Sequence, residues 1–127
     1  MKKYLIFAAF SGAASVALGA FGAHGLKDVL TPALLNSFLT GIRYQVIHSL
    51  LLLIIVLLPF LKANQKKNIS LILTLGILLF SGSIYVLTLG FVPAKYIWFI
   101  TPIGGLFFLL GWLLLGFYLI KEKSDID

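Results

Sequence analysis

The chain has no cysteine among its 127 residues and only four acidic side chains. The missing cysteines exclude disulfides, thiol redox chemistry and thiolate metal sites. The carboxylates all lie outside the long apolar stretches, at Asp28, Glu122, Asp125 and Asp127. Proton relays in pumps depend on ionisable groups within the membrane, most often carboxylates. The sequence therefore argues against an acid-coupled pump.

Charge of either sign is scarce, since charged residues make up 11% of the chain, hydrophobic residues 61%, and the mean hydropathy is +1.09. Uncharged stretches run through 4–26, 44–61, 68–94 and 96–120. A membrane-spanning helix needs about 20 mostly apolar residues, and each stretch is close to that length or longer. We predict an all-α integral membrane protein, a single domain built as a four-transmembrane-helix bundle. The expected spans are about 4–23, 44–61, 69–91 and 102–120, with outer connections at 24–31 and 92–101 and a cytoplasmic loop at 62–68.

The basic residues are distributed unequally between the two ends of the predicted bundle. Seven lie at the end of the bundle where the chain would start and finish: Lys2, Lys3, Lys62, Lys66, Lys67, Lys121 and Lys123. Three lie at the other end: Lys27, Arg43 and Lys95. Because cytoplasmic ends carry the excess of Lys and Arg, both termini are predicted to be cytoplasmic. We expect these lysines to contact anionic lipid headgroups, and we expect no nucleic-acid partner.

An internal repeat emerges when the sequence is shifted by 70 residues. The triplet FSG at 10–12 matches FSG at 80–82, and Thr-Pro at 31–32 matches Thr-Pro at 101–102. We interpret the chain as two tandem helical hairpins, a parallel repeat; the alternative is convergent transmembrane composition. Thr-Pro also predicts helix starts near Pro32 and Pro102, with the threonine as the N-cap. Residues 32–43 then either continue the second helix or form an interfacial helix that bends at Gly41.

Polar side chains from several helices are expected to meet in the outer third of the membrane. Counting about 1.5 Å per residue from the cytoplasmic lysines places His48, Ser81 and Tyr85 at similar depths. We predict a polar pocket or lipid-headgroup site formed by His24, Asp28, Arg43, Tyr44, Gln45, His48, Ser81 and Tyr85. Within it, Asp28 can pair with Arg43, and an arginine at headgroup depth can hold phosphate.

Small residues predict the close helix contacts. Such stripes let membrane helices approach one another closely. The expected packing residues are Gly12, Ser15, Gly19, Gly22, Gly104, Gly105 and Gly111. The stripe on the first helix predicts that this helix is the central packing element and that it brings His24 into hydrogen-bonding reach of Tyr44, Gln45 or His48.

The two histidines leave several interpretations open. Neutral, hydrogen-bonded imidazoles would lock the first two helices together. The other interpretations are a binding site for a small polar group or lipid headgroup, metal or bis-histidine haem ligation, and catalysis. Two histidines without a supporting carboxylate are a weak metal signal. We expect no metal, no cofactor and no enzyme activity.

The stretches GAFGAHGL, YQVIHS, FSGSIY and TPIGGLFFLLGW resemble one family of small bacterial four-helix membrane proteins, domain of unknown function 423 or uncharacterised protein family 0382, similar to eukaryotic transmembrane protein 256. The resemblance covers nearly the whole chain. It implies an integral protein of the bacterial cytoplasmic membrane and transfers no catalytic residue.

Three functions follow as hypotheses. The first is a structural or interaction protein of the cell envelope that binds lipid, a membrane-protein partner or a second copy of itself. The second is a small-molecule or lipid-headgroup binder, or a minimal channel or transporter, that uses the outer polar pocket. The third is a haem-binding membrane anchor.

Overall fold

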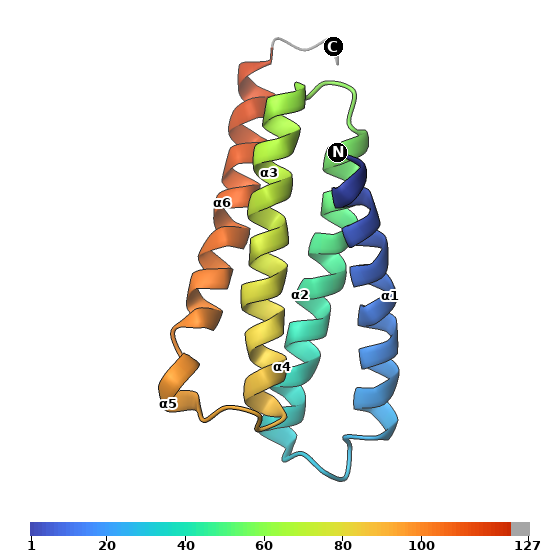
Figure 1. The fold of residues 1–127 in the computed structure, drawn as a ribbon, viewed down its shortest axis with the longest axis vertical. Helices are drawn as coiled ribbons and strands as arrows, with labels where there is room; N and C mark the ends of the chain where they lie inside the picture. Colours follow the sequence, from blue (N-terminus) through green and yellow to red (C-terminus); the bar gives the residue numbers. More distant parts are fainter. Residues whose placement is uncertain (123–127) are drawn as a thin grey trace.

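The computed structural model describes residues 1–122, which form helices joined by short connections (Figure 1). Four segments are long and apolar enough to cross a membrane: Lys2–His24, Pro32–Leu57, Ala63–Thr88 and Ala94–Lys121. The first is α1 (Lys2–His24) and the second α2 (Pro32–Leu57). The third span is continuous through α3 (Ala63–Gly76), the π-helical turn η1 (Ile77–Ser81) and α4 (Gly82–Thr88). The fourth comprises the short α5 (Ala94–Ile97) and α6 (Ile100–Lys121). The predicted four-span helical architecture is confirmed.

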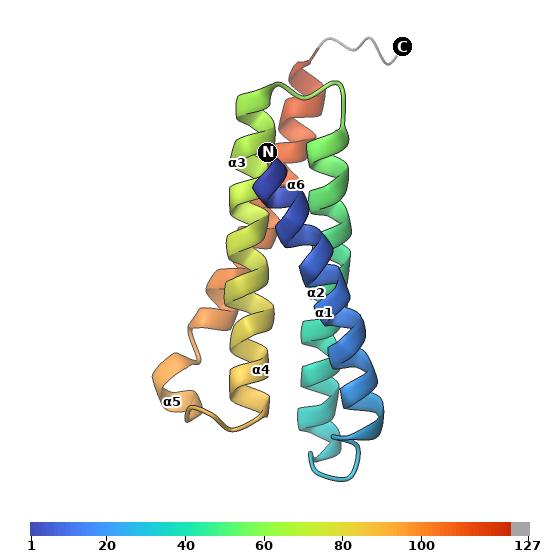
Figure 2. The same cartoon turned by 45° about the vertical axis from the view of Figure 1, so that its right-hand side comes forward.

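The two outer positions of the bundle are occupied by α1 and α6. α1 packs mainly on α2, α2 packs on the third span, and α6 packs on the third span and also contacts His48 of α2. Figure 2 shows α1 crossing the face of α2, with α5 standing away from the bundle. In the apolar 18-residue window of each span, 22% of the residues are buried in the first and 17% in the fourth, against 44% in the second and 39% in the third. The expectation that α1 is the central packing element is therefore wrong, because α2 and the third span occupy the centre.

The apolar core lies between α2 and the third span, and its largest fully buried side chains include Leu52, Ile55, Ile69 and Leu73. α1 adds Tyr4 and Ala8 to it, and α6 adds Phe108. Leucine and isoleucine dominate this core.

The second helix starts as predicted and continues without a break. Thr31 is its N-cap, and the Thr31 hydroxyl accepts a hydrogen bond from Leu34 N at 3.3 Å. At 1.5 Å per residue, 26 residues extend about 39 Å, which exceeds a hydrocarbon core of about 30 Å. Residues 32–43 are thus a helical extension, not a separate interfacial helix. Gly41 is no bend but a contact point, since a Cβ there would lie 3.0 Å from the Tyr85 ring.

Other boundaries differ from the prediction. α6 begins at Ile100 and not at Pro102, so Thr101 lies inside the helix, where its hydroxyl is 2.5 Å from that of Ser83. The loop expected at 62–68 is mostly helix, because α3 begins at Ala63 and the Gln65 side chain accepts a hydrogen bond from Lys62 N at 2.8 Å. The third span ends at Thr88, and Gly90 turns the chain with a φ of +76°, which glycine adopts without strain.

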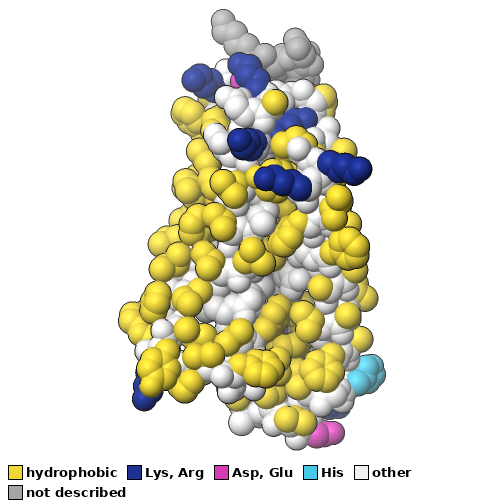
Figure 3. Space-filling model, viewed as in Figure 1, with side chains coloured by type: hydrophobic (Ala, Val, Ile, Leu, Met, Phe, Trp, Pro, Cys, Tyr) yellow, Lys and Arg dark blue, Asp and Glu magenta, His cyan; other side chains and the backbone are white. Residues whose placement is uncertain are grey.

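The lysines concentrate at the end of the bundle where α1 begins and α6 ends (Figure 3). There Lys62 Nζ lies 3.0 Å from Glu122 Oε1, and Gln65 Nε2 donates to the same oxygen at 2.9 Å. These contacts, the Lys62 hydrogen bond first and Gln65 second, lower the pKa of Glu122. Lys66 Nζ donates to Val56 O at 3.0 Å and so ties the start of α3 to the end of α2. Lys123 lies outside the described residues.

The two hairpins run in the same direction along the bundle, and both second helices, α2 and α6, start at the same end (Figure 1). Thr31 is the N-cap of α2 and Thr101 lies in the first turn of α6. Their contacts are not equivalent, however. Ser81 donates to Gly41 O on α2 at 2.7 Å, whereas a strict repeat of the α1–α2 contact of Ser11 would direct Ser81 toward α6. The superposition of the two hairpins stays a prediction.

Candidate functional site: a polar network beside two membrane-facing pockets

A buried glutamine on α2 joins three helices through hydrogen bonds. Gln45 Nε2 donates to Ser11 O of α1 at 3.0 Å and to Ser11 Oγ at 3.2 Å. Gln45 Oε1 accepts from the hydroxyl of Tyr85 on α4 at 2.5 Å. A carbonyl can only accept, so the contact with Ser11 O fixes which end of the amide faces α1. Because Gln45 is 6% exposed, losing these partners would leave polar groups unsatisfied in an apolar environment.

Serine hydroxyls extend this network. Ser49 Oγ lies 2.8 Å from Ser11 Oγ and 2.7 Å from Gln45 O, one turn earlier on the same helix. Ser15 Oγ donates to Ser11 O at 2.9 Å. Sequence reasoning did not assign Ser11 and Ser49 to the site, although Ser11 lies four residues before Ser15 and Ser49 four residues after Gln45.

His48 lies on another face of α2 and packs against α6. Its ring stacks on Phe108 with centroids 3.6 Å apart. Trp112 Nε1 is 3.2 Å from His48 Nε2, and His48 Nδ1 is 2.7 Å from Tyr44 O. An indole N–H only donates and a carbonyl only accepts, so His48 is the neutral tautomer with its hydrogen on Nδ1. Both ring nitrogens are thus satisfied, and His48 connects α2 to α6. Trp112 was not foreseen from the sequence.

His24 and Asp28 do not belong to this cluster. Both are exposed at the outer end of the bundle, and within residues 1–122 His24 makes no side-chain hydrogen bond. The reason is helical geometry. Gly22 is the residue of α1 that meets α2, where a Cβ would lie 3.2 Å from the Phe38 ring. Two residues further, the side chain has rotated by about 200°. The prediction that His24 contacts Tyr44, Gln45 or His48 is therefore wrong.

Arg43 does not pair with Asp28. Its Nε donates to Leu39 O at 3.3 Å, and its Nη2 contacts Thr40 Oγ1 at 3.4 Å and Asn36 Oδ1 at 3.5 Å. The side chain therefore runs back along α2 toward the outer surface, as long cationic side chains do near helix ends in membranes. The one ion pair within residues 1–122 joins Lys62 and Glu122 at the opposite end.

The predicted packing residues behave unequally. A Cβ on Gly104 would lie 2.7 Å from Phe80 Cα, and one on Gly111 2.7 Å from the Leu73 side chain, so α6 closes on the third span at both positions. Gly22 meets α2, and Ser15 is buried beside the polar network. Gly19 has an ordinary contact at 4.0 Å, Gly105 one at 3.7 Å, and Gly12 has open space where a Cβ would stand. Those last three are not required for close approach.

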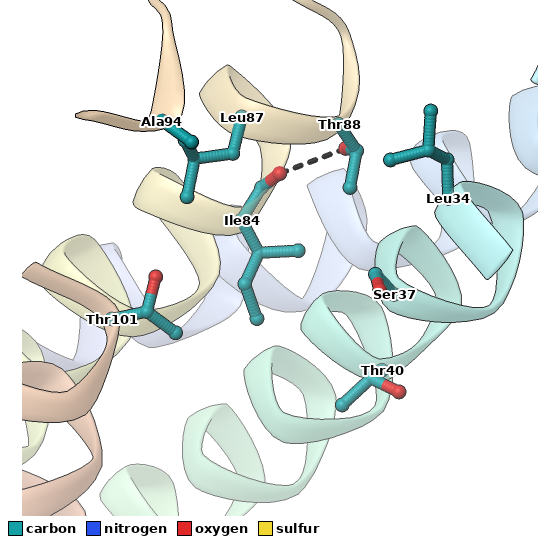
Figure 4. A pocket seen from close by; sticks show the side chains of 8 residues that line it. All are labelled: Leu34, Ser37, Thr40, Ile84, Leu87, Thr88, Ala94 and Thr101. Carbon is teal, nitrogen blue, oxygen red and sulfur yellow. Dashed lines mark hydrogen bonds between the residues drawn. The ribbon is translucent and has the colours of Figure 1, made fainter. Parts of the chain in front are cut away.

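Two pockets open beside these groups. The first, called here the outer pocket, has a volume of about 400 Å³ and lies between the start of α2, α4 and the α5–α6 region (Figure 4). Its lining residues are Leu34, Ser37, Thr40, Ile84, Leu87, Thr88, Ala94 and Thr101. The second, called here the α1–α4 groove, has a volume of about 340 Å³ and lies over the Gln45 network. Its lining residues are Phe7, Phe10, Ser11, Ala14, Gln45, Ile77, Leu78, Ser81, Gly82 and Tyr85.

The predicted single site is therefore divided. Gln45, Ser81 and Tyr85 line the groove, Arg43 contacts a residue of the outer pocket, and Tyr44 and His48 pack toward α6. No group of three or more His, Cys, Asp or Glu side chains able to hold a metal occurs within residues 1–122. The two histidines are also separated, one exposed at the end of α1 and one buried within α2. As placed, they do not form a haem-ligating pair.

Four apolar spans, a core without a carboxylate in the described part, and lysines gathered at one end define a small multi-pass membrane protein. The family model "Protein of unknown function (DUF423)" matches residues 18–105, and the chain belongs to this family. It is 45% identical to a UPF0382 membrane protein of Haemophilus influenzae, over 97% of this chain and 98% of that protein. It is 41% identical to the UPF0382 inner membrane protein YgdD of Escherichia coli K12, over 94% and 92%. A UPF0382 membrane protein of Staphylococcus epidermidis is 38% identical over 95% and 98%. No solved structure matches the chain. The protein is a multi-pass protein of the cytoplasmic membrane.

Proposed function

We propose that the protein is a lipid-binding structural component of the cytoplasmic membrane, with the outer pocket holding an acyl chain and Arg43 holding the lipid phosphate. The observation that carries the proposal is a guanidinium that pairs with no carboxylate within residues 1–122 and contacts the hydroxyl of Thr40, a residue that lines the apolar pocket. The apolar pocket suits an acyl chain and the guanidinium suits a phosphate. A phospholipid combines both groups in one molecule.

The pocket suits a hydrocarbon chain even though threonines line it. Thr88 Oγ1 donates to Ile84 O at 2.8 Å, and the Thr101 hydroxyl is paired with that of Ser83. Thr40 Oγ1 donates to Asn36 O at 2.9 Å, and in Figure 4 this hydroxyl points away from the pocket. The threonines therefore present mainly methyl groups beside Leu34, Ile84 and Leu87.

Arg43 retains hydrogens for an anion. Of its five N–H groups, those on Nε and Nη2 contact oxygens of α2, while Nη1 has no partner within residues 1–122. The contacts with Asn36 and Thr40 hold the guanidinium at the level of the outer pocket. Arginine N–H groups bind phosphate oxygens strongly. Within residues 1–122 the Arg43 guanidinium forms no ion pair with a carboxylate.

Binding can be measured by native mass spectrometry of the purified protein with two probes of equal acyl chains, phosphatidylglycerol and diacylglycerol. We expect Arg43→Gln to weaken phosphatidylglycerol binding about tenfold, the loss of one or two charged hydrogen bonds, and to leave diacylglycerol binding unchanged. Ser37→Phe projects into the pocket from an exposed position and should weaken both probes.

The matched control is Lys27→Gln, which removes another exposed cation at the outer end, away from the pocket residues. It should bind both lipids as the parent protein does. Equal losses of phosphatidylglycerol binding in Arg43→Gln and Lys27→Gln would show that general surface charge, and not a site at Arg43, attracts the lipid. Unchanged binding in both Arg43→Gln and Ser37→Phe would overturn the proposal.

A further inference from the structure

The α1–α4 groove is a second cavity, separate from the outer pocket, with which it shares no lining residue. Its walls are apolar: Phe7 and Phe10 stand on the α1 side, and Ile77 and Leu78 on the third span. Phe10 is 74% exposed, so the rim of the groove faces the surrounding lipid. α1 contacts the third span only sparsely, which leaves this opening between them.

The backbone of the third span contributes to the width of the groove. Gly82 follows the π-helical turn Ile77–Ser81, and a Cβ at Gly82 would meet nothing within 4 Å. Single π-helical turns inside membrane or soluble helices are frequent at functional sites. The groove thus has empty space at the point where the helix departs from regular α geometry.

The polar floor of the groove has acceptors but few available hydrogens. The Ser81 hydroxyl donates to Gly41 O at 2.7 Å, and the Tyr85 hydroxyl donates to Gln45 Oε1. Gln45 Nε2 donates to Ser11 O at 3.0 Å and to Ser11 Oγ at 3.2 Å. The hydroxyls of Ser11 and Ser49 use their hydrogens on each other and on Gln45 O. A hydroxyl that donates still has lone pairs to accept, so the phenol of Tyr85 and the hydroxyl of Ser81 can each take one more hydrogen bond.

We propose that the α1–α4 groove binds an apolar molecule that ends in a hydroxyl group, a long-chain or isoprenoid alcohol taken from the membrane. Its chain lies between Phe10 and Leu78, and its hydroxyl donates to the oxygen of Tyr85 or Ser81. A ketone, ester or ether of the same length brings only acceptors to a floor that also offers acceptors. The donor requirement therefore selects alcohols over their ethers.

The probe for this site is 1-decanol with a photoreactive diazirine in its chain, added to the full-length protein in lipid nanodiscs. After irradiation, mass spectrometry of peptides maps the modified residues. We expect labels on groove residues of α1 and of the third span. Unlabelled 1-decanol should suppress labelling at concentrations about tenfold lower than 1-methoxydecane, which has a chain of similar length and no hydroxyl hydrogen.

Two glycine variants give a matched comparison. Gly82→Leu fills the groove, and Gly116→Leu adds the same side chain on α6, where a Cβ also meets nothing within 4 Å. Labelling should disappear in the first and persist in the second. Equal competition by the ether, labelling outside the groove, or undiminished labelling of Gly82→Leu would each overturn the proposal. The competition by alcohol and ether uses the unmodified protein, so this test stands even if Gly82→Leu fails to fold.

Discussion

The two histidines of this chain have opposite surroundings, and this difference predicts their mutational effects. His48 accepts from Trp112 and contacts Tyr44 O, whereas His24 is exposed. We expect His48→Phe, which preserves a ring against Phe108, to lower the free energy of unfolding by about 1–3 kcal/mol, because the Trp112 N–H loses its acceptor. His24→Ala should stay within about 0.5 kcal/mol of the parent.

Reversible unfolding in detergent would measure both values. A double-mutant cycle adds a control: His48→Phe with Trp112→Phe should be non-additive because these residues touch, and His48→Phe with His24→Ala should be additive. A coupling between the two histidines would mean that His24 belongs to the network after all.

The contacts of Glu122 with Lys62 and Gln65 predict that the stability of the protein depends on pH. The hydrogen bonds from Lys62 and Gln65 lower the pKa of Glu122 in the folded protein below the ordinary value of 4.5. Its contribution to stability is therefore fully present above that ordinary value and is lost as the pH falls through the lowered pKa. Thermal unfolding between pH 6 and pH 3 should show a larger loss for the parent than for Glu122→Gln. Parallel pH profiles would contradict the prediction.

At the scale of residues, the sequence predicts depth better than direction. Counting along each helix predicts similar depths for His48, Ser81 and Tyr85, because rise per residue is nearly constant. In the structure Ser81 and Tyr85 line the groove with Gln45, whereas His48 faces α6. The direction of His24 depends on how α1 rotates against α2, and each residue changes that direction by about 100°. The contact of Trp112 with His48 depends on which helices become neighbours, and the spacing of residues carries little information about that choice.

At the scale of elements, the neighbouring glycines Gly104 and Gly105 of α6 differ in how closely they pack against the third span. A Cβ on Gly104 would lie 2.7 Å from Phe80 Cα, so backbone must move, while one on Gly105 would lie 3.7 Å from the Phe80 ring, an ordinary contact. Gly104→Ala should therefore destabilise the protein by about 1–3 kcal/mol through overpacking. Gly105→Ala should be neutral or slightly stabilising, since alanine favours helix. Thermal unfolding of the pair compares them directly, and equal melting temperatures would show that α6 does not close on the third span at Gly104.

The same Thr-Pro pair gives different helix starts in the two hairpins. Thr31 caps α2, because the residues directly before it are not helical. Thr101 already lies inside α6, and its hydroxyl contacts that of Ser83. A local capping signal specifies a start only where no preceding residues can extend the helix. The π-helical turn at Ile77–Ser81 likewise has no local sequence signature that distinguishes it from an α-helix.

At the scale of the whole molecule, composition determines the class of fold and tertiary packing determines the order of the helices. The four uncharged stretches predict four spans because charges are costly in the bilayer. The stripe of small residues on α1 suggests a central helix, yet in the structure Gly19 and Gly22 face α2 while Gly12 faces open space. Glycine shows where backbones can approach, but not how many helices do so.

The concentration of lysines at one end of the molecule predicts its orientation, with both termini in the cytoplasm. Because the chain has no cysteine, single-cysteine variants provide clean reporters. Lys66→Cys, at the lysine-rich end, should be shielded from a membrane-impermeant thiol reagent in intact cells and should react after the cells are opened. Lys27→Cys, exposed at the opposite end, should react in intact cells. The reverse pattern would turn the protein over in the membrane, and the outer pocket with Arg43 would then face phosphates of the inner leaflet. Labelling of both positions in intact cells would contradict a fixed orientation, because Lys27 follows the end of α1 and Lys66 lies in the first turn of α3, at the opposite end of the bundle.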